Sequence, residues 1–165
     1  MLFKYVPILR ISILFGGCMK YAHGEFIITR CGDAVVTQAY GPWNKECVEH
    51  FVTEYRTIVE ELFGKVWCSI VCVAGESLLI PDAEILLRAR IEAMHPLGLT
   101  HIAVVLRDST AKATTKAQLK RVYSGLNIEF TFVEAIEEAV SWAEQGGFTI
   151  NSKNISSHLE KVASK

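Results

Sequence analysis

Residues 66–73 read VWCSIVCV, a nearly continuous apolar run between the turn residues Gly64 and Gly75. Its length and its β-branched residues predict a strand. Because the run leaves no polar face for solvent, the strand should be buried on both sides, as in a parallel sheet with helices on its two faces. We therefore expect an α/β domain in which residues 66–73 form the central strand.

The residues before this run predict a hairpin and then a helix. Residues 26–29 and 35–40 are rich in strand-forming types, and the Cys-Gly-Asp sequence at 31–33 suits a turn between them. Asn44 stands where the N-cap of a helix belongs. The helix should extend to about Phe63, because apolar residues recur at spacings of three and four up to that point.

Helices and strands alternate after the central strand. A helix should begin at Pro81-Asp82 and end near His95, because Pro96 disfavours helical geometry in the residue before it. The remaining expected elements are a strand at 101–106, a helix at 110–124, a strand at 128–133 and a helix at 134–145. Such alternation predicts parallel strand pairs joined by right-handed crossovers.

The order of elements predicts a single α/β domain with a mixed sheet of four to five strands and about four helices. The sheet should be mostly parallel, with the opening hairpin adding an antiparallel pair. The expected divisions are an amino-terminal arm or upstream extension at 1–24, the α/β domain at 25–150 and a polar carboxyl-terminal tail at 151–165. We expect this tail to be weakly helical at most and loosely held.

The composition agrees with a globular domain and excludes some partners. Of the 165 residues, 50% are hydrophobic and 21% are charged, which is enough apolar material for a core. The formal net charge of −1 argues against nucleic-acid binding, which normally needs a basic excess. No stretch reaches the roughly 20 apolar residues of a transmembrane helix, so no membrane partner is expected.

The cysteines and histidines follow no pattern typical of disulfide-bonded or metal-binding proteins. The cysteines are odd in number, and none belongs to a C-x-x-C pair. They are Cys18, Cys31, Cys47, Cys68 and Cys72. We expect buried, reduced thiols, and the sequence predicts no metal site and no cofactor.

The first 18 residues, MLFKYVPILRISILFGGC, allow three interpretations. The apolar stretch ending at Cys18 is similar to a secretory or lipoprotein signal, which would make the protein exported or membrane-anchored. Arg10 within the stretch and the large Phe15 near its end argue against a signal. The second interpretation is a structured arm. The third is an upstream extension, with Met19 as the true start. We expect a cytoplasmic protein.

The order of the predicted elements resembles the STAS domain, named after sulphate transporters and anti-sigma factor antagonists. The resemblance spans about residues 25–147 and rests on three stretches. They are the hairpin with the helix after 41–44, the strand VWCSIVCV with its following loop and helix, and the closing stretch LKRVYSGLNIEFTFVEAIEEAVSWA at 119–143. The resemblance implies a STAS-like fold and a regulatory role.

The chain departs from this family at the helix that follows the central strand. STAS antagonists carry a phosphorylatable serine there, in an Asp-Ser-Ser-Gly-like turn, whereas residues 79–84 read LIPDAE. Ser77 lies upstream of that point. The chain therefore resembles the bacterial STAS-like proteins that lack this serine, a group that shares its fold with lipid-binding domains, and the resemblance does not support a phosphorylation switch.

Two loops at the carboxyl ends of predicted strands are candidate ligand sites, because open α/β sheets bind ligands at that edge. The first contains Gly75, Glu76 and Ser77, where the glycine permits close backbone approach and the next helix would attract an anion. The second contains Ser109 and Thr110, whose hydroxyls suit a phosphate-sized ligand. In both loops the alternative is an ordinary connection with a capped helix.

The helix expected at 82–95 carries apolar residues on two faces. Leu87, Ile91 and Met94 share one face, which should pack on the sheet. The second face is formed by Ile85, Leu86, Ala89 and Ala93. We expect a second copy of the chain to cover this face, with the amino-terminal arm, an apolar ligand or full burial as alternatives.

These features predict a non-catalytic regulatory or ligand-binding module that forms a homodimer and acts through a protein partner or a small apolar or anionic ligand. One alternative is a small hydrolase or transferase that uses Glu76, Ser77 and a histidine brought close by folding. Another is a membrane-associated module anchored by residues 1–18.

Overall fold

The structure, a computed structural model, describes residues 22–165. Its strands are β1 (Glu25–Cys31), β2 (Ala34–Tyr40), β3 (Trp67–Ala74), β4 (Leu99–Val105) and β5 (Glu129–Val133). Its α-helices are α1 (Lys45–Val59), α2 (Pro81–Met94), α3 (Lys112–Tyr123), α4 (Ile136–Gln145) and α5 (Ser152–Ala163). Short 3₁₀ turns, η1 (Glu60–Leu62) and η2 (His95–Leu97), follow α1 and α2. The interpretations of residues 1–18 and of Met19 concern positions outside the described residues.

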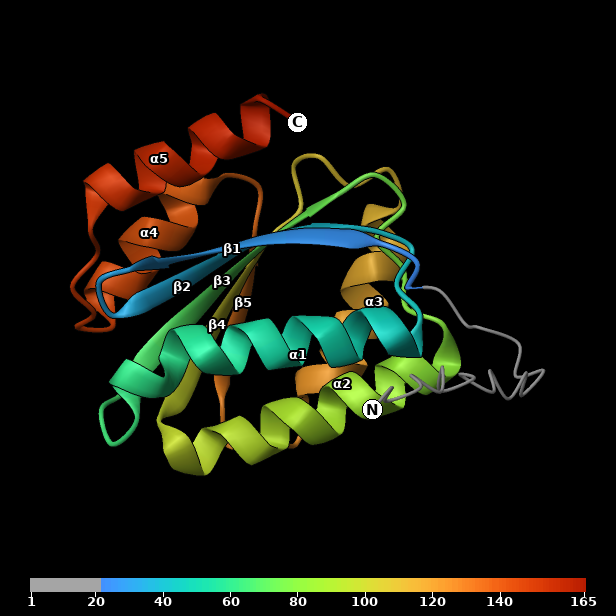
Figure 1. The fold of residues 1–165 in the computed structure, drawn as a ribbon, viewed down its shortest axis with the longest axis horizontal. Coiled ribbons are helices and arrows are strands. Elements are labelled where there is room, and N and C mark those ends of the chain that lie inside the picture. The colour runs from blue at the N-terminus through green and yellow to red at the C-terminus, as the bar shows by residue number, and fades with distance from the viewer. Residues whose placement is uncertain (1–21) are drawn as a thin grey trace, which may run out of the picture.

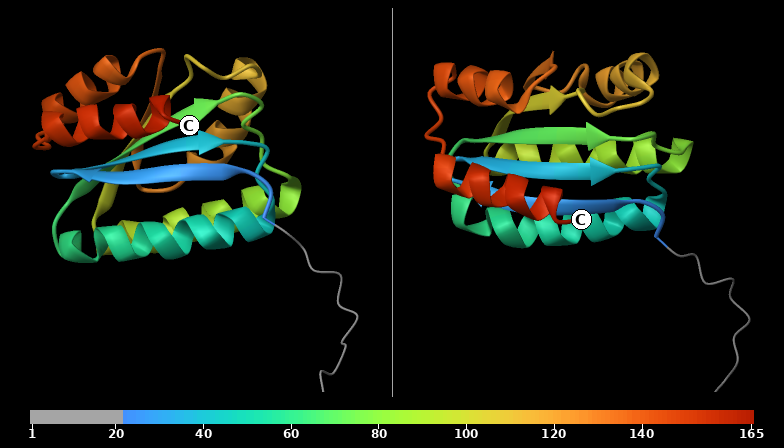
Figure 2. Two further views of the ribbon diagram at one scale, coloured as in Figure 1. Left: turned by 45° about the horizontal axis from the view of Figure 1, so that its top comes forward. Right: turned by 90° about the horizontal axis from the view of Figure 1, so that it is seen from above.

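The described strands form one mixed sheet in chain order, β1-β2-β3-β4-β5. β1 pairs with β2 in antiparallel orientation, and the other neighbouring pairs are parallel. The connecting helices α1, α2 and α3 cover one face of the sheet, and α4 and α5 cover the other (Figure 1, Figure 2). Right-handed crossovers between successive strands place all three connecting helices on one side. The expected single-domain α/β fold is confirmed, with five α-helices in the described residues instead of about four.

The central position expected for the apolar run VWCSIVCV is confirmed, because β3 is the middle strand of the sheet. Trp67 and Val73 belong to the core beneath α1–α3, whereas Cys68 and Ile70 belong to the core beneath α4 and α5. None of these side chains is more than 5% exposed. The strand is therefore buried on both faces, as its sequence requires.

Cap and turn residues lie where the chain changes direction. Asn44 is the N-cap of α1, and its side-chain oxygen accepts a hydrogen bond from the Cys47 backbone N–H at 3.0 Å. In the β1–β2 hairpin Gly32 has a φ of +77°, and a Cβ atom there would lie 2.3 Å from the Thr149 carbonyl oxygen. Both facts restrict this turn position to glycine.

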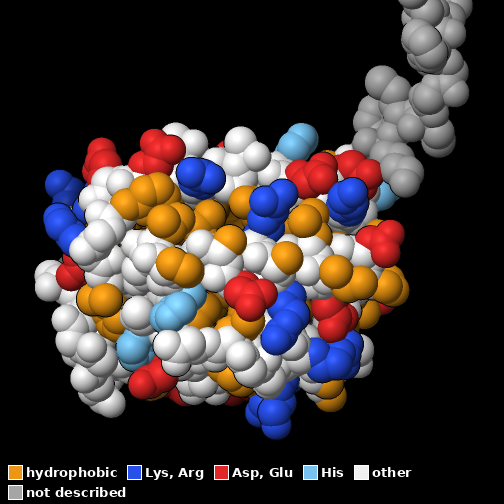
Figure 3. Space-filling view, turned by 90° about the horizontal axis from the view of Figure 1, so that it is seen from below, with side chains coloured by type: hydrophobic (Ala, Val, Ile, Leu, Met, Phe, Trp, Pro, Cys, Tyr) orange, Lys and Arg blue, Asp and Glu red, His pale blue; other side chains and the backbone are white. Residues whose placement is uncertain are grey.

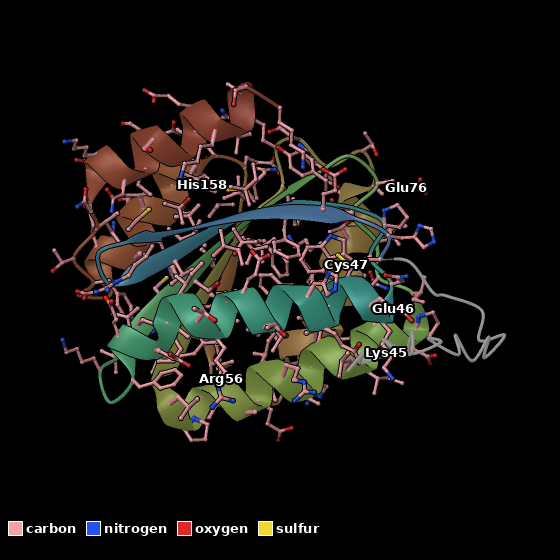
Figure 4. The ribbon with its side chains drawn as sticks, in the orientation of Figure 1. Lys45, Glu46, Cys47, Arg56, Glu76 and His158 are labelled. Atoms are coloured by element: carbon pink, nitrogen blue, oxygen red, sulfur yellow. The ribbon has the colours of Figure 1, made fainter. Side chains whose placement is uncertain are left out.

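The loose tail expected at 151–165 is wrong. The segment forms α5, which is capped by Asn151 and packs on β1. His158 is fully buried and points from α5 towards β1, where its Nδ1 atom lies 2.9 Å from Thr29 Oγ1 (Figure 4). The segment is polar on average, but its few apolar residues share one face, and Ile155 packs on the core beneath α4 and α5. The average polarity conceals an amphipathic helix.

Candidate functional site

The two loops identified in the sequence lie side by side at the carboxyl ends of β3 and β4. The Gly75 N–H donates to the Asp108 carbonyl at 2.9 Å, and the Thr110 N–H donates to the Gly75 carbonyl at 3.0 Å. Gly75 and Ser109 also form an isolated parallel bridge. The backbone groups of Gly75 thus join the two loops and are not free to hold an anion.

The side chains of Ser77 and Ser109 stabilise the loops themselves, whereas Thr110 is exposed. Ser77 Oγ donates to main-chain carbonyls, reaching that of Ala39 at 3.4 Å. Ser109 is 7% exposed, and its Oγ accepts a hydrogen bond from the Ala111 N–H at 3.2 Å. Glu76 is exposed and points away from the sheet (Figure 4). The loops are closed connections between elements, and ligand binding by their side chains stays a prediction.

Within residues 22–165, no histidine is hydrogen-bonded to Ser77. His95 pairs with the Leu99 carbonyl at 3.1 Å, and His101 pairs with the Thr100 hydroxyl at 2.9 Å. The same part of the chain holds no group of three His, Cys, Asp or Glu side chains able to bind a metal ion. The hydrolase or transferase alternative therefore stays a prediction that no serine–histidine contact supports.

The loop between β3 and α2 is held by the residues around it. The Trp43 N–H donates to the Leu78 carbonyl at 2.8 Å, and the Ile80 N–H donates to the Trp43 carbonyl at 3.1 Å. On the other side, the Gln118 side chain from α3 makes two hydrogen bonds to the Leu79 backbone, at 2.8 and 2.7 Å. This fixed loop forms one wall of a cavity.

The cavity lies between the sheet and the helices α1, α2 and α3 and has a volume of about 80 Å³; we call it the sheet–helix cavity. The strands line it with Thr37, Ala39, Ser69, Val71, Val73, Leu99 and Ile102. The helices and loops line it with Trp43, Phe51, Val52, Tyr55, Ser77, Leu78, Leu79, Leu87, Arg90, Ile91, Met94, Leu119 and Tyr123. Most of these side chains are apolar, so the cavity suits an apolar molecule.

Hydroxyl groups provide the polar part of the buried lining. Tyr55 OH accepts a hydrogen bond from Trp67 Nε1 at 3.1 Å. Burial raises the pKa of Tyr55 to about 12, so the phenol stays protonated near neutral pH. Thr37 is fully buried, and its Oγ1 has no hydrogen-bond partner in the described part of the chain. Such an unpaired buried hydroxyl is uncommon in folded proteins.

We infer that the cavity opens to solvent between α1 and α2, because the exposed residue of its lining, Arg90, lies on α2. Val52 on α1 and Ile91 on α2 are half-buried, and Arg90 is exposed. Figure 3 shows hydrophobic side chains reaching the surface among charged ones on this side of the molecule. Arg56 follows Val52 by one helical turn and lies on the α2 side of α1 (Figure 4). Neither arginine forms a salt bridge with a described residue.

The outer face of α2 holds the residues expected at an interface. Ile85 is 69% exposed, and Ala89 and Ala93, one and two turns further along, are also exposed. Leu86 is half-buried and packs on the core beneath α1–α3. The exposed apolar row therefore consists of Ile85, Ala89 and Ala93, whereas Leu86 belongs to the packing of the monomer.

The described cysteines are Cys31, Cys47, Cys68 and Cys72, and all are buried free thiols, as expected. Burial raises the pKa of Cys68 and of Cys72 to about 12. Both thiols therefore stay protonated, and a thiol is a much weaker nucleophile than a thiolate. Their burial favours a packing role over a catalytic one.

The sequence analysis names Ser77, which lines the sheet–helix cavity, but it does not identify the other polar residues of the lining. The available signal is that Thr37 and Ser69 occupy positions of β2 and β3 that face α1–α3, among apolar neighbours. Threonine and serine are common in strands, and a hydroxyl usually finds a partner. The sequence therefore gives no reason to treat either residue as part of a site.

Comparisons with protein-family models, with curated proteins and with solved structures gave no match for this chain. None of the helices in residues 22–165 is both long and apolar enough to cross a membrane. The geometry of the chain itself has to support any functional proposal.

Proposed function

We propose that this protein is a non-catalytic binding module that takes a small, largely apolar ligand into the sheet–helix cavity. The supporting observation is the cavity itself, which is lined mainly by apolar side chains and opens between α1 and α2. Small-molecule sites are typically concave and apolar, with a few polar groups that orient the ligand. Thr37, Ser69 and Arg90 are among the polar groups available here.

An empty cavity of this kind lowers the stability of a protein. Protein interiors are densely packed, and few voids exceed the size of a water molecule. Atoms that line an empty space lack neighbours on that side and lose the corresponding van der Waals contacts. A ligand that fills the cavity restores these contacts, so binding should raise the free energy of unfolding.

The cavity volume limits the size of the buried part of the ligand. A closed apolar cavity of about 150 Å³ accommodates benzene in another protein. The sheet–helix cavity is smaller, but its opening lets part of a ligand extend between α1 and α2. A short alkyl group therefore matches the buried space, and a single ring fits with part of it in the opening. A longer molecule needs α1 and α2 to move apart.

The resemblance of the element order to the STAS domain supports a regulatory use of this binding. We propose that occupancy of the cavity changes the packing of α1 against α2, and that the exposed row on α2 brings two copies of the chain together. Ile85, Ala89 and Ala93 are the residues that support this homodimer. The free buried cysteines suit a reducing compartment, which supports a cytoplasmic location.

Fluorine NMR of para-fluorotoluene tests the proposed binding. Titration of the full chain into this probe should broaden and shift the fluorine signal. Ala39 lines the cavity and is 6% exposed, so Ala39→Leu should fill the space and abolish the change. Ala117→Leu makes the same substitution on the exposed face of α3 and serves as the matched control.

The expected result is binding by wild type and by Ala117→Leu, and loss of binding by Ala39→Leu with an unchanged circular dichroism spectrum. Equal binding by all three proteins would place the probe elsewhere and contradict the proposal. Absence of binding by wild type at any accessible concentration would contradict it as well.

A further inference from the structure

Thr37 is a fully buried residue of the sheet–helix cavity whose hydroxyl lacks a hydrogen-bond partner in the described part of the chain. Thr37 lies on β2, 0% exposed, in register with Val71 of β3, and its side chain lines the cavity. Its Oγ1 has no hydrogen-bond partner within residues 22–165. The neighbouring hydroxyl of Tyr55 differs in this respect, because it accepts a hydrogen bond from Trp67 Nε1 at 3.1 Å.

A buried hydroxyl without a partner is unfavourable by about 1–3 kcal/mol. A water molecule would remove part of this loss only if it found two to four polar partners. The surroundings of Thr37 are mainly apolar side chains, Ala39 and Val71 among them. A ligand that brings its own hydrogen-bonding group satisfies Thr37 and fills the apolar space in one step.

We propose that the ligand is an uncharged, largely apolar molecule with one hydroxyl or carbonyl group, and that this group hydrogen-bonds to Thr37 Oγ1 on the floor of the cavity. This inference rests on the proposed function and specifies its ligand class. A charged group at this position would lose its hydration without a countercharge, because the arginine that lines the cavity, Arg90, is exposed at the mouth. An uncharged polar group loses far less hydration free energy on entering the cavity.

The hydroxyl of threonine serves either kind of ligand group. It donates to a carbonyl oxygen, and it accepts from or donates to a hydroxyl. Thr37→Val keeps the shape of the side chain and replaces the hydroxyl by a methyl group. The ligand-free variant should be as stable as wild type or more stable, because it removes an unpaired buried hydroxyl. Affinity for a hydroxyl-bearing ligand should nevertheless fall.

A pair of probes of the same shape separates the hydrogen bond from apolar filling. The dissociation constants of para-fluorophenol and para-fluorotoluene are measured by fluorine NMR with wild type, Thr37→Val and Thr37→Ser. We expect Thr37→Val to weaken the binding of para-fluorophenol by about 3- to 10-fold, which corresponds to the loss of one neutral hydrogen bond. Thr37→Ser, which restores the hydroxyl, should recover most of this affinity, and para-fluorotoluene should change less than twofold or bind Thr37→Val more tightly.

Different outcomes contradict different statements. Suppose that para-fluorotoluene binds in the cavity, but that Thr37→Val weakens the binding of both probes equally or of neither. The hydrogen bond to Thr37 is then refuted, and the proposed apolar site stands. If neither probe binds wild type, both proposals fail. A nuclear Overhauser effect between para-fluorophenol and the Thr37 methyl group in wild type gives a second measurement that needs no variant. If this effect is absent in a complex saturated with para-fluorophenol, the proposed hydrogen bond to Thr37 is overturned.

Discussion

Arg88 is predicted to contribute strongly to the packing of α2 against α3. It is half-buried, and its Nη1 atom lies 2.8–2.9 Å from three carbonyl oxygens at the end of α3. These carbonyls belong to Arg121, Val122 and Ser124. Carbonyls in the last turn of a helix lack partners within the helix, and a positive charge there also interacts favourably with the helix dipole. One side chain therefore completes the end of α3.

Arg88→Met removes the guanidinium but keeps a long apolar stem. A hydrogen bond to a charged group contributes about 1.5–3 kcal/mol, and a cation at a helix end adds about 0.3–1 kcal/mol. One nitrogen has only two hydrogens for its three acceptors, and the site is partly exposed, so the contributions do not add fully. We predict a loss of about 2 kcal/mol, which is about 4–8 °C in Tm for a domain of this size.

Urea denaturation followed by circular dichroism measures this loss. Arg90→Met on the same helix is the matched control, because Arg90 is exposed and forms no salt bridge with a described residue. The control should change the free energy of unfolding by no more than about 0.5 kcal/mol. Equal losses in the two variants would refute the assignment of the Arg88 contacts.

Three further predictions concern α5, the buried thiols and α2. Burial and the nearby Lys161 lower the pKa of His158 in the folded protein below its usual 6.5. Below pH 6.5 the unfolded chain therefore binds a proton at His158 that the folded protein does not bind, and the urea midpoint of the wild type should fall. The urea midpoint of His158→Gln should fall less over this pH range. Equal pH dependence in the two proteins would exclude a contribution from His158. In a Cys18→Ser background, Cys72 should react with a thiol reagent only after unfolding, because it is 9% exposed and its pKa is raised to about 12; rapid labelling of the native protein would contradict its placement. The wild-type chain should sediment as a dimer, and Ala89→Glu should sediment as a folded monomer, because a charge on the exposed α2 face opposes its burial in an interface. A monomeric wild type at tens of micromolar would refute self-association.

The sequence predicts the sheet well because its signals are local. The apolar run at 66–73 has no polar face, and only a strand covered on both sides accommodates it. The cap at Asn44 likewise needs only the residues around it, and its side chain accepts the hydrogen bond that the sequence position suggests.

The parts that the sequence does not predict depend on contacts between distant segments. α5 is polar on average, and its burial at His158 becomes evident only when β1 lies beneath it. On α2, periodicity separates two apolar faces but does not show that Leu86 reaches the core while Ile85 stays exposed. The sheet–helix cavity is a space left between several elements, and no single stretch of sequence encodes it.

A crystal structure of the protein under xenon pressure tests the existence of the ligand cavity most directly, because xenon enters apolar cavities without needing a specific chemical partner. We predict xenon density between the sheet and α2, in contact with Val71, Leu87 and Ile102. Side chains filling this space, or xenon bound at other positions while this space stays empty, would contradict the proposed binding site.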